Sequence, residues 1–131
     1  MQIPSWAELY APVIARVLMG GMFLMAGIQK FMTLDTTAGY IATSFLPAPM
    51  AMAVIAAIVE TVLGASLLIG YRTKLAAAGL AVFTVIATIA FHTGWSANQM
   101  QQVLFTKNLA IVAGLLYMMA FGSGRYAVNN K

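Results

Sequence analysis

The sequence predicts an all-α membrane protein, an antiparallel bundle of four transmembrane helices with a short interfacial helix between the first and second spans. Composition is the first reason, because 62% of the 131 residues are hydrophobic and only 8% are charged, whereas roughly 25% are charged in an average soluble domain. The second reason is that the apolar residues form four blocks, each near the ~20 residues that a helix needs to cross the bilayer. The blocks predict spans at about residues 12–31, 50–70, 74–92 and 104–122.

These spans leave little chain over, so residues 1–131 are expected to form a single transmembrane domain. Backbone amides in hydrocarbon must be satisfied within their own segment, which makes continuous apolar runs of this length helices rather than barrel strands. The N-terminal segment lacks the basic start of a signal peptide, and no cleavage-like site follows the first block. The first block is therefore expected to remain as a span.

The longest connection follows the first span and predicts the interfacial helix. Asp35 is a favourable N-cap residue for a short amphipathic pattern that ends at Pro47 and Pro49. Tyr40 from this segment and Trp95 from the third connection are expected at headgroup depth on the same outer side. The two loops would then cover the outer end of the bundle.

The net charge of +4 comes from cations scattered singly along the chain, which does not indicate a nucleic-acid interface. Positive-inside bias explains them better, because an even number of spans puts both termini on one side. That side collects Arg72, Lys74, Arg125 and Lys131, against Lys30 and Lys107 near the opposite mouth. Both termini are therefore predicted to be cytoplasmic.

The chain has no cysteine and a single histidine. Disulfides, thiolate metal sites and iron–sulfur clusters are excluded for this chain alone. Three carboxylates far apart in the sequence also argue against a metal site built by the protein. Any redox chemistry would need a bound small molecule or a partner protein.

Polar and small residues follow single faces of the first two predicted helices. In the first helix one face carries Arg16, Gly20, Phe23, Gly27 and Lys30. In the second a small-sided face carries Ala53, Ala56, Ala57, Glu60 and Gly64. Small residues allow helices to approach closely in lipid, so Glu60 is expected to face protein.

A charged Glu60 inside the membrane must find a cation or take up a proton, because burying the charge costs about 2.5–3.5 kcal/mol on insertion scales. Arg16 is the expected partner, since its long side chain could reach from the cytoplasmic side of the first helix. One interpretation is a structural ion pair that fixes the helix register. The other is a proton-handling or ligand-binding carboxylate, and both stay open at this point.

A second polar group is expected at the outer mouth. Thr84, Thr88 and His92 recur at steps of four in the third helix, and Lys107 and Asn108 open the fourth. Each of His92, Lys30 and Lys107 alone is typical of a helix end or a snorkelling anchor. Together with Asn108 they would supply hydrogen-bond donors to the polar head of a ligand.

Taken in order, these features resemble the DoxX family of small four-helix bacterial inner-membrane proteins. The matching segments are "ARVLMGGMFLMAGIQKF", Glu60 followed by "GASLLIGYRTKLAA", His92, and "FTKNLAIVAGLL" with its Gly-x-Gly tail. The resemblance implies a bacterial inner (plasma) membrane location and an association with quinone-linked oxidation of sulfur compounds or with assemblies handling oxidative stress. One departure is that Ala127 and Asn129 stand where the family usually has Ser and Asp.

The leading hypothesis is therefore a membrane component of a redox system that binds a quinone or another lipophilic ligand, non-covalently, as an accessory oxidoreductase subunit. Glu60 would handle the proton and Arg16 would assist it, while Lys30, His92, Lys107 and Asn108 would hold the ligand. The expected partners are the lipid bilayer and a redox protein; a homo-oligomer stays open. The alternatives are a non-catalytic assembly protein that recruits enzymes and, less favoured, a small proton or solute conduit.

Overall fold

The computed structural model describes residues 3–91 and 99–129. Within these ranges the chain is helical and contains no strand, which confirms the predicted fold class. The four helices that are long and apolar enough to cross a membrane are α1 (Ser5–Met32), α3 (Pro49–Ile69), α4 (Thr73–Phe91) and α5 (Gln99–Phe121). The fifth, α2 (Leu34–Ile41), occupies the place predicted for the short interfacial helix.

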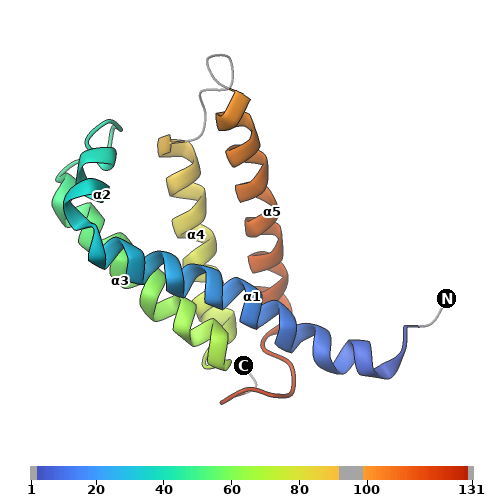
Figure 1. Ribbon diagram of the computed structural model, residues 1–131. Coiled ribbons are helices and arrows are strands. Elements are labelled where there is room, and N and C mark those ends of the chain that lie inside the picture. Colours follow the sequence, from blue (N-terminus) through green and yellow to red (C-terminus); the bar gives the residue numbers. More distant parts are fainter. Residues whose placement is uncertain (1–2, 92–98, 130–131) are drawn as a thin grey trace.

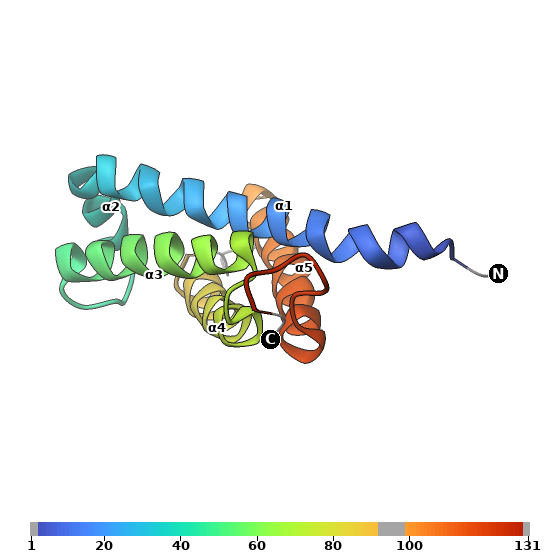
Figure 2. The same ribbon diagram turned by 90° about the horizontal axis from the view of Figure 1, so that it is seen from below.

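The four long helices form two antiparallel pairs that cross obliquely (Figures 1 and 2). α1 lies along α3, α4 lies along α5, and α3 joins the pairs by packing on α4. The two pairs diverge toward the end that carries α2 (Figure 1). The core between them is built from Phe23, Leu67, Leu80, Leu115 and three alanines of α4, Ala76, Ala77 and Ala81.

Glycines bring the backbones of α1 and α3 into direct contact. A methyl group at Gly20 would lie 2.6 Å from the backbone nitrogen of Leu68 and 2.8 Å from the carbonyl oxygen of Gly64. A methyl group at Gly27 would lie 2.5 Å from the backbone nitrogen of Thr61. No residue larger than glycine fits at these positions without separating the helices, so they fix the register of the pair.

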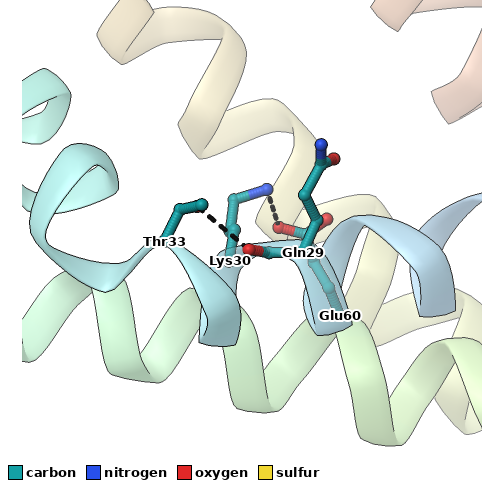
Figure 3. Close-up of polar contacts among 4 residues, drawn as sticks. All are labelled: Gln29, Lys30, Thr33 and Glu60. Carbon is teal, nitrogen blue, oxygen red and sulfur yellow. Dashed lines mark hydrogen bonds and ion pairs between the residues drawn. The ribbon is translucent and has the colours of Figure 1, made fainter.

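The turn between α1 and α2 differs from the prediction. Thr33 alone separates the two helices and is the N-cap of α2, whereas Asp35 lies inside its first turn. The Thr33 hydroxyl donates to the carbonyl oxygen of Gln29 at 2.9 Å and so closes α1 (Figure 3). Pro49 is the first residue of α3, where the missing N–H breaks no helical hydrogen bond.

α3 ends in a Schellman motif at Gly70, whose φ of 76° suits glycine. The N–H of Tyr71 donates to the carbonyl oxygen of Ser66 at 2.9 Å, and the N–H of Gly70 donates to that of Leu67 at 3.2 Å. The C-terminal tail then crosses this end of α3. The N–H groups of Val128 and Asn129 donate to the carbonyl oxygens of Ile69 and Gly70 at 3.1 and 3.2 Å.

α1 begins at Ser5, ahead of the predicted span, and continues through Pro12. Its first turns extend beyond the end of α3 (Figure 2). Glu8 in the first turn complements the helix dipole, so the polar segment before the apolar block can be helical without lying in the hydrocarbon. The helix is therefore longer than the apolar block on which the prediction was based.

Candidate functional site

A cavity of about 480 Å³ lies where the two helix pairs diverge, and every one of the five helices contributes to its wall. Most of the lining is apolar and comes from Met22, Phe23, Ala26, Ile41, Leu46, Met52, Ile55, Ala56, Phe83, Ile86, Ala87, Phe91 and Ile111. The polar side chains in the wall are few: Lys30, Thr37, Tyr40, Glu60, Thr84, Lys107 and Asn108. An apolar wall with a small number of convergent polar groups is typical of a small-molecule site.

The central polar feature of the cavity is an ion pair between α1 and α3. The Nζ atom of Lys30 lies 2.6 Å from Oε1 of Glu60 (Figure 3). Glu60 is 4% exposed, while the Lys30 side chain is half-buried at 31%. The close packing of Gly27 against Thr61 puts the last turn of α1 beside the middle of α3, which is why the lysine reaches the carboxylate.

The pairing of Glu60 with Arg16, expected from the sequence, is wrong. Arg16 is 2% exposed and donates to the carbonyl oxygen of Leu68 at 3.3 Å and to that of Tyr126 in the C-terminal tail. Leu68 lies eight residues beyond Glu60, or ~12 Å along α3 at ~1.5 Å per residue. Arg16 is therefore too far along the helix to serve the carboxylate, and it does not line the cavity.

The opposite wall of the cavity is a hydrogen-bonded ladder between α4 and α5. The side-chain amide of Asn108 donates to Oγ1 of Thr88 at 3.0 Å. The hydroxyl of Thr88 donates to the carbonyl oxygen of Thr84 at 2.7 Å, and the hydroxyl of Thr84 donates to that of Leu80 at 2.8 Å. These bonds satisfy buried polar groups in an apolar region and hold Asn108 facing the cavity, beside Lys107.

An aromatic pair closes the α2 end of the cavity. The rings of Tyr40 from α2 and Phe91 from the end of α4 stack with their centroids 4.8 Å apart. Both side chains line the cavity. Tyr40 was predicted to lie at headgroup depth, and its stacking on Phe91 at the cavity wall was not indicated by its position in the sequence.

The structure thus gathers four of the predicted ligand-binding residues, Lys30, Glu60, Lys107 and Asn108, around one cavity. The fifth, His92, lies outside the described residues, as does Trp95. From the sequence, Lys30 was interpreted as a helix-end anchor or a ligand-binding residue, and its bond to Glu60 was missed. The signal was present, because Lys30 lies one turn from Gly27 on the face that packs against α3.

Comparison with known proteins agrees with this architecture. The model of the DoxX family matches residues 11–93, which is more than half of the chain. The chain belongs to the DoxX family. The match covers most of α1 and all of α2, α3 and α4, and therefore includes the Lys30–Glu60 pair.

Relatives of this DoxX protein include three bacterial membrane proteins. It is 31% identical over 117 residues to the inner membrane protein YqjF of Escherichia coli (strain K12), with 89% of this chain and 88% of the relative covered. It is 26% identical to the inner membrane protein YphA of the same organism, over 91% of this chain and 88% of the relative. An uncharacterized membrane protein of Mycobacterium tuberculosis, Rv3486, is 28% identical over 98% of this chain and 88% of its own length.

No solved structure matches the chain at a significant level. The family membership, the names of the relatives and the four spans together make this DoxX protein a multi-pass protein of the inner membrane. The cytoplasmic position of both termini stays a prediction.

Proposed function

We propose that this DoxX protein binds a lipophilic quinone, or a ligand of similar shape, in the cavity between its helix pairs and serves as an accessory membrane subunit of a redox system. The observation that carries the proposal is the Lys30–Glu60 ion pair in the wall of an otherwise largely apolar cavity. The volume of about 480 Å³ falls within the roughly 300–1,000 Å³ of ordinary small-molecule sites. The apolar tail of a quinone would match the apolar part of the cavity wall, and its polar ring would match the polar side chains.

The exposure of two residues in the cavity wall supports entry of the ligand from the membrane. Ile55 of α3 and Ile86 of α4 line it and are each 49% exposed. Both lie within helices that are long and apolar enough to span the bilayer, at a part of the cavity wall that is open to the surroundings. A ligand dissolved in the lipid would enter sideways between the helix pairs without crossing water.

The polar groups suit a ligand that gains and loses protons with its electrons. The Glu60 carboxylate can accept or donate a proton, and Lys30 supplies the counter-charge that the sequence had assigned to Arg16. Because the chain has no cysteine, thiol and iron–sulfur carriers of its own are excluded. Electrons would therefore come from a partner protein or a substrate, which favours an accessory subunit over a complete enzyme.

Replacing Glu60 with Gln tests the proposal. The amide keeps the shape of the side chain but removes its charge and its capacity to take up a proton. We expect the dissociation constant for a decyl-substituted benzoquinone, measured by titration of the detergent-solubilised protein, to rise by about tenfold or more. Glu8→Gln is the matched control, because Glu8 is an exposed carboxylate of α1 away from the cavity. Equal affinities in the two variants would remove Glu60 from the role.

An assembly function is the second candidate, and the tail supplies an observation in its favour. The tail is fixed against α1 and α3, yet Tyr126 and Val128 are 56% and 65% exposed. A rigid segment with exposed apolar side chains suits recruitment of another protein. This function predicts that Y126S and V128S abolish recovery of a partner while E60Q leaves it intact. Native mass spectrometry of the purified protein would then detect bound phospholipid and no quinone.

A further inference from the structure

The cavity carries an unmatched positive charge. Lys30 and Glu60 neutralise one another at 2.6 Å. Lys107 from α5 lines the same cavity and forms no ion pair with any residue in the ranges 3–91 and 99–129. The described part of the wall therefore has a net charge of +1 beside a largely apolar surface.

Resting on the proposed function, we propose that the natural ligand is an acidic amphiphile, with one ionised head group on an apolar body, rather than a neutral molecule. Lys107 is exposed at one edge of this largely apolar wall, and an anionic head placed next to its ammonium group would supply a counter-charge there. An acidic hydroxyquinone and a fatty acid share this chemistry.

The neighbouring groups favour an anion at Lys107 over one at Lys30. The Asn108 amide uses one N–H group on Thr88 and has a second to donate, so Lys107 and Asn108 form adjacent donors on α5. The Glu60 carboxylate, which would repel an anion, is 4% exposed and paired with Lys30. The head group therefore binds on the α5 side while the tail lies along the apolar wall.

Lys107 could instead extend toward lipid phosphates, as lysines near membrane interfaces do. In that case its charge would have no effect on which ligand the cavity selects. The two roles differ in a measurable way, because only a cavity role makes the preference for acidic ligands depend on Lys107.

The experiment compares two matched ligand pairs in phosphatidylcholine nanodiscs at neutral pH, by calorimetric titration with binding to empty discs subtracted. One pair is 2-hydroxy-3-undecyl-1,4-naphthoquinone and its neutral 2-methoxy ether; the other is palmitate and hexadecanol. We expect the acidic member of each pair to bind about tenfold tighter or more. Lys107→Gln should remove the preference, and Lys74→Gln, which removes the same charge at the other end of the bundle, should retain it.

Glu60→Gln should change the affinity for acidic ligands in the opposite direction to Lys107→Gln. A variant that was merely misfolded would not bind these ligands more tightly, so this result guards against a folding artefact. Removing the carboxylate frees the charge of Lys30, so binding of the acidic ligands should tighten while that of the neutral quinone weakens. Equal binding within both pairs, or a preference that survives in Lys107→Gln, would overturn the inference. Tight binding of the neutral ether alone would overturn it and leave the proposed function standing. If palmitate binds more tightly than hexadecanol and neither quinone binds, the inference of an acidic ligand is supported and the proposal of a quinone ligand is refuted.

Discussion

Arg16 joins three segments of the chain through one guanidinium group. It lies in α1, donates to the carbonyl oxygen of Leu68 near the end of α3, and donates to that of Tyr126 in the tail. The ring of Tyr126 also stacks on that of Tyr10, with the centroids 6.0 Å apart. A planar group with several donors can serve two carbonyls at once, which a lysine ammonium does less well. Arg16 therefore fixes the tail rather than the cavity.

Replacing Arg16 with Met should free the tail while leaving the helices in place. The amide protons of Val128 and Asn129, now bonded to Ile69 and Gly70, should exchange with deuterium at least about tenfold faster, because two charge-assisted hydrogen bonds of ~1.5–3 kcal/mol each are lost. Hydrogen-exchange mass spectrometry of the C-terminal peptide measures this rate.

Lys107→Met is the control for Arg16→Met, because Lys107 lies at the other end of the bundle. Exchange in this variant should match that of the unmodified protein. Unchanged tail exchange in Arg16→Met would show that the backbone bonds alone hold the tail.

The tail also shows what Ala127 and Asn129 contact, at the positions where the resemblance implies Ser and Asp. The side-chain oxygen of Asn129 accepts a hydrogen bond from the N–H of Arg72 at 2.9 Å. A carboxylate oxygen could accept the same bond, so an aspartate at this position would make this contact as well and would differ by its charge. Ala127 packs beside Gly70, so close that a side chain added to that glycine would collide with it.

At the scale of the helices, the glycines of α1 and α3 matter more for their position than for their number. Gly20 meets the backbone of α3, whereas a methyl group at its neighbour Gly21 would find nothing within 4 Å. The two glycines are therefore a matched pair for substitution, and alanine is expected to affect the stability differently at the two positions. One lies in the contact and the other faces away from it.

Gly20→Ala should lower the thermal stability in detergent, because the new methyl group forces the helices apart at a cost of about 1–3 kcal/mol. Gly21→Ala should be neutral or slightly stabilising, since alanine favours a helix over glycine by roughly 0.5–1 kcal/mol. Melting curves of the two variants, recorded side by side, test this. Equal midpoints would mean that the α1–α3 contact is looser than described.

The sequence predicted the contacting faces of these helices but not their axial register. Arg16, Gly20, Phe23 and Gly27 of α1 are all buried, as are the five residues expected on the facing surface of α3. The residues on one face of a helix show which side of it contacts a neighbouring helix, but they do not show how far the two helices are shifted along their axes. Arg16 and Lys30 lie on the same face of α1, so the axial register of α1 against α3 determines which of them reaches Glu60.

At the scale of the whole molecule, apolar side chains point outward as well as inward. Among the described residues of α5 only Leu115 is buried, and large side chains such as Leu109, Leu116 and Phe121 are exposed. In a bilayer these surfaces contact acyl chains, and close packing rather than water exclusion holds the helices together. Length and composition were therefore enough to predict the number of spans.

The crossing of the two helix pairs could not be predicted in the same way. It depends on which side chains of α3 and α4 meet, and this is not visible in the spacing of apolar residues along either helix. The cavity is a consequence of that divergence. Its polar residues were recognisable in the sequence, whereas their arrangement around one space required the structure.

If the cavity opens between the helix pairs, a bulky group at its rim should block it. Ile86 lines the cavity, while Val82, one turn earlier on α4, is 60% exposed and does not. The chain has no cysteine, so I86C and V82C can each be labelled at a single site with a maleimide nitroxide. We expect labelled I86C to bind the decyl-substituted benzoquinone about tenfold more weakly or worse, because the label occupies space that the ligand needs. Labelled V82C should bind normally. Equal binding by both would place the ligand elsewhere on the protein, since the label is the same and only its position along α4 differs, by one turn.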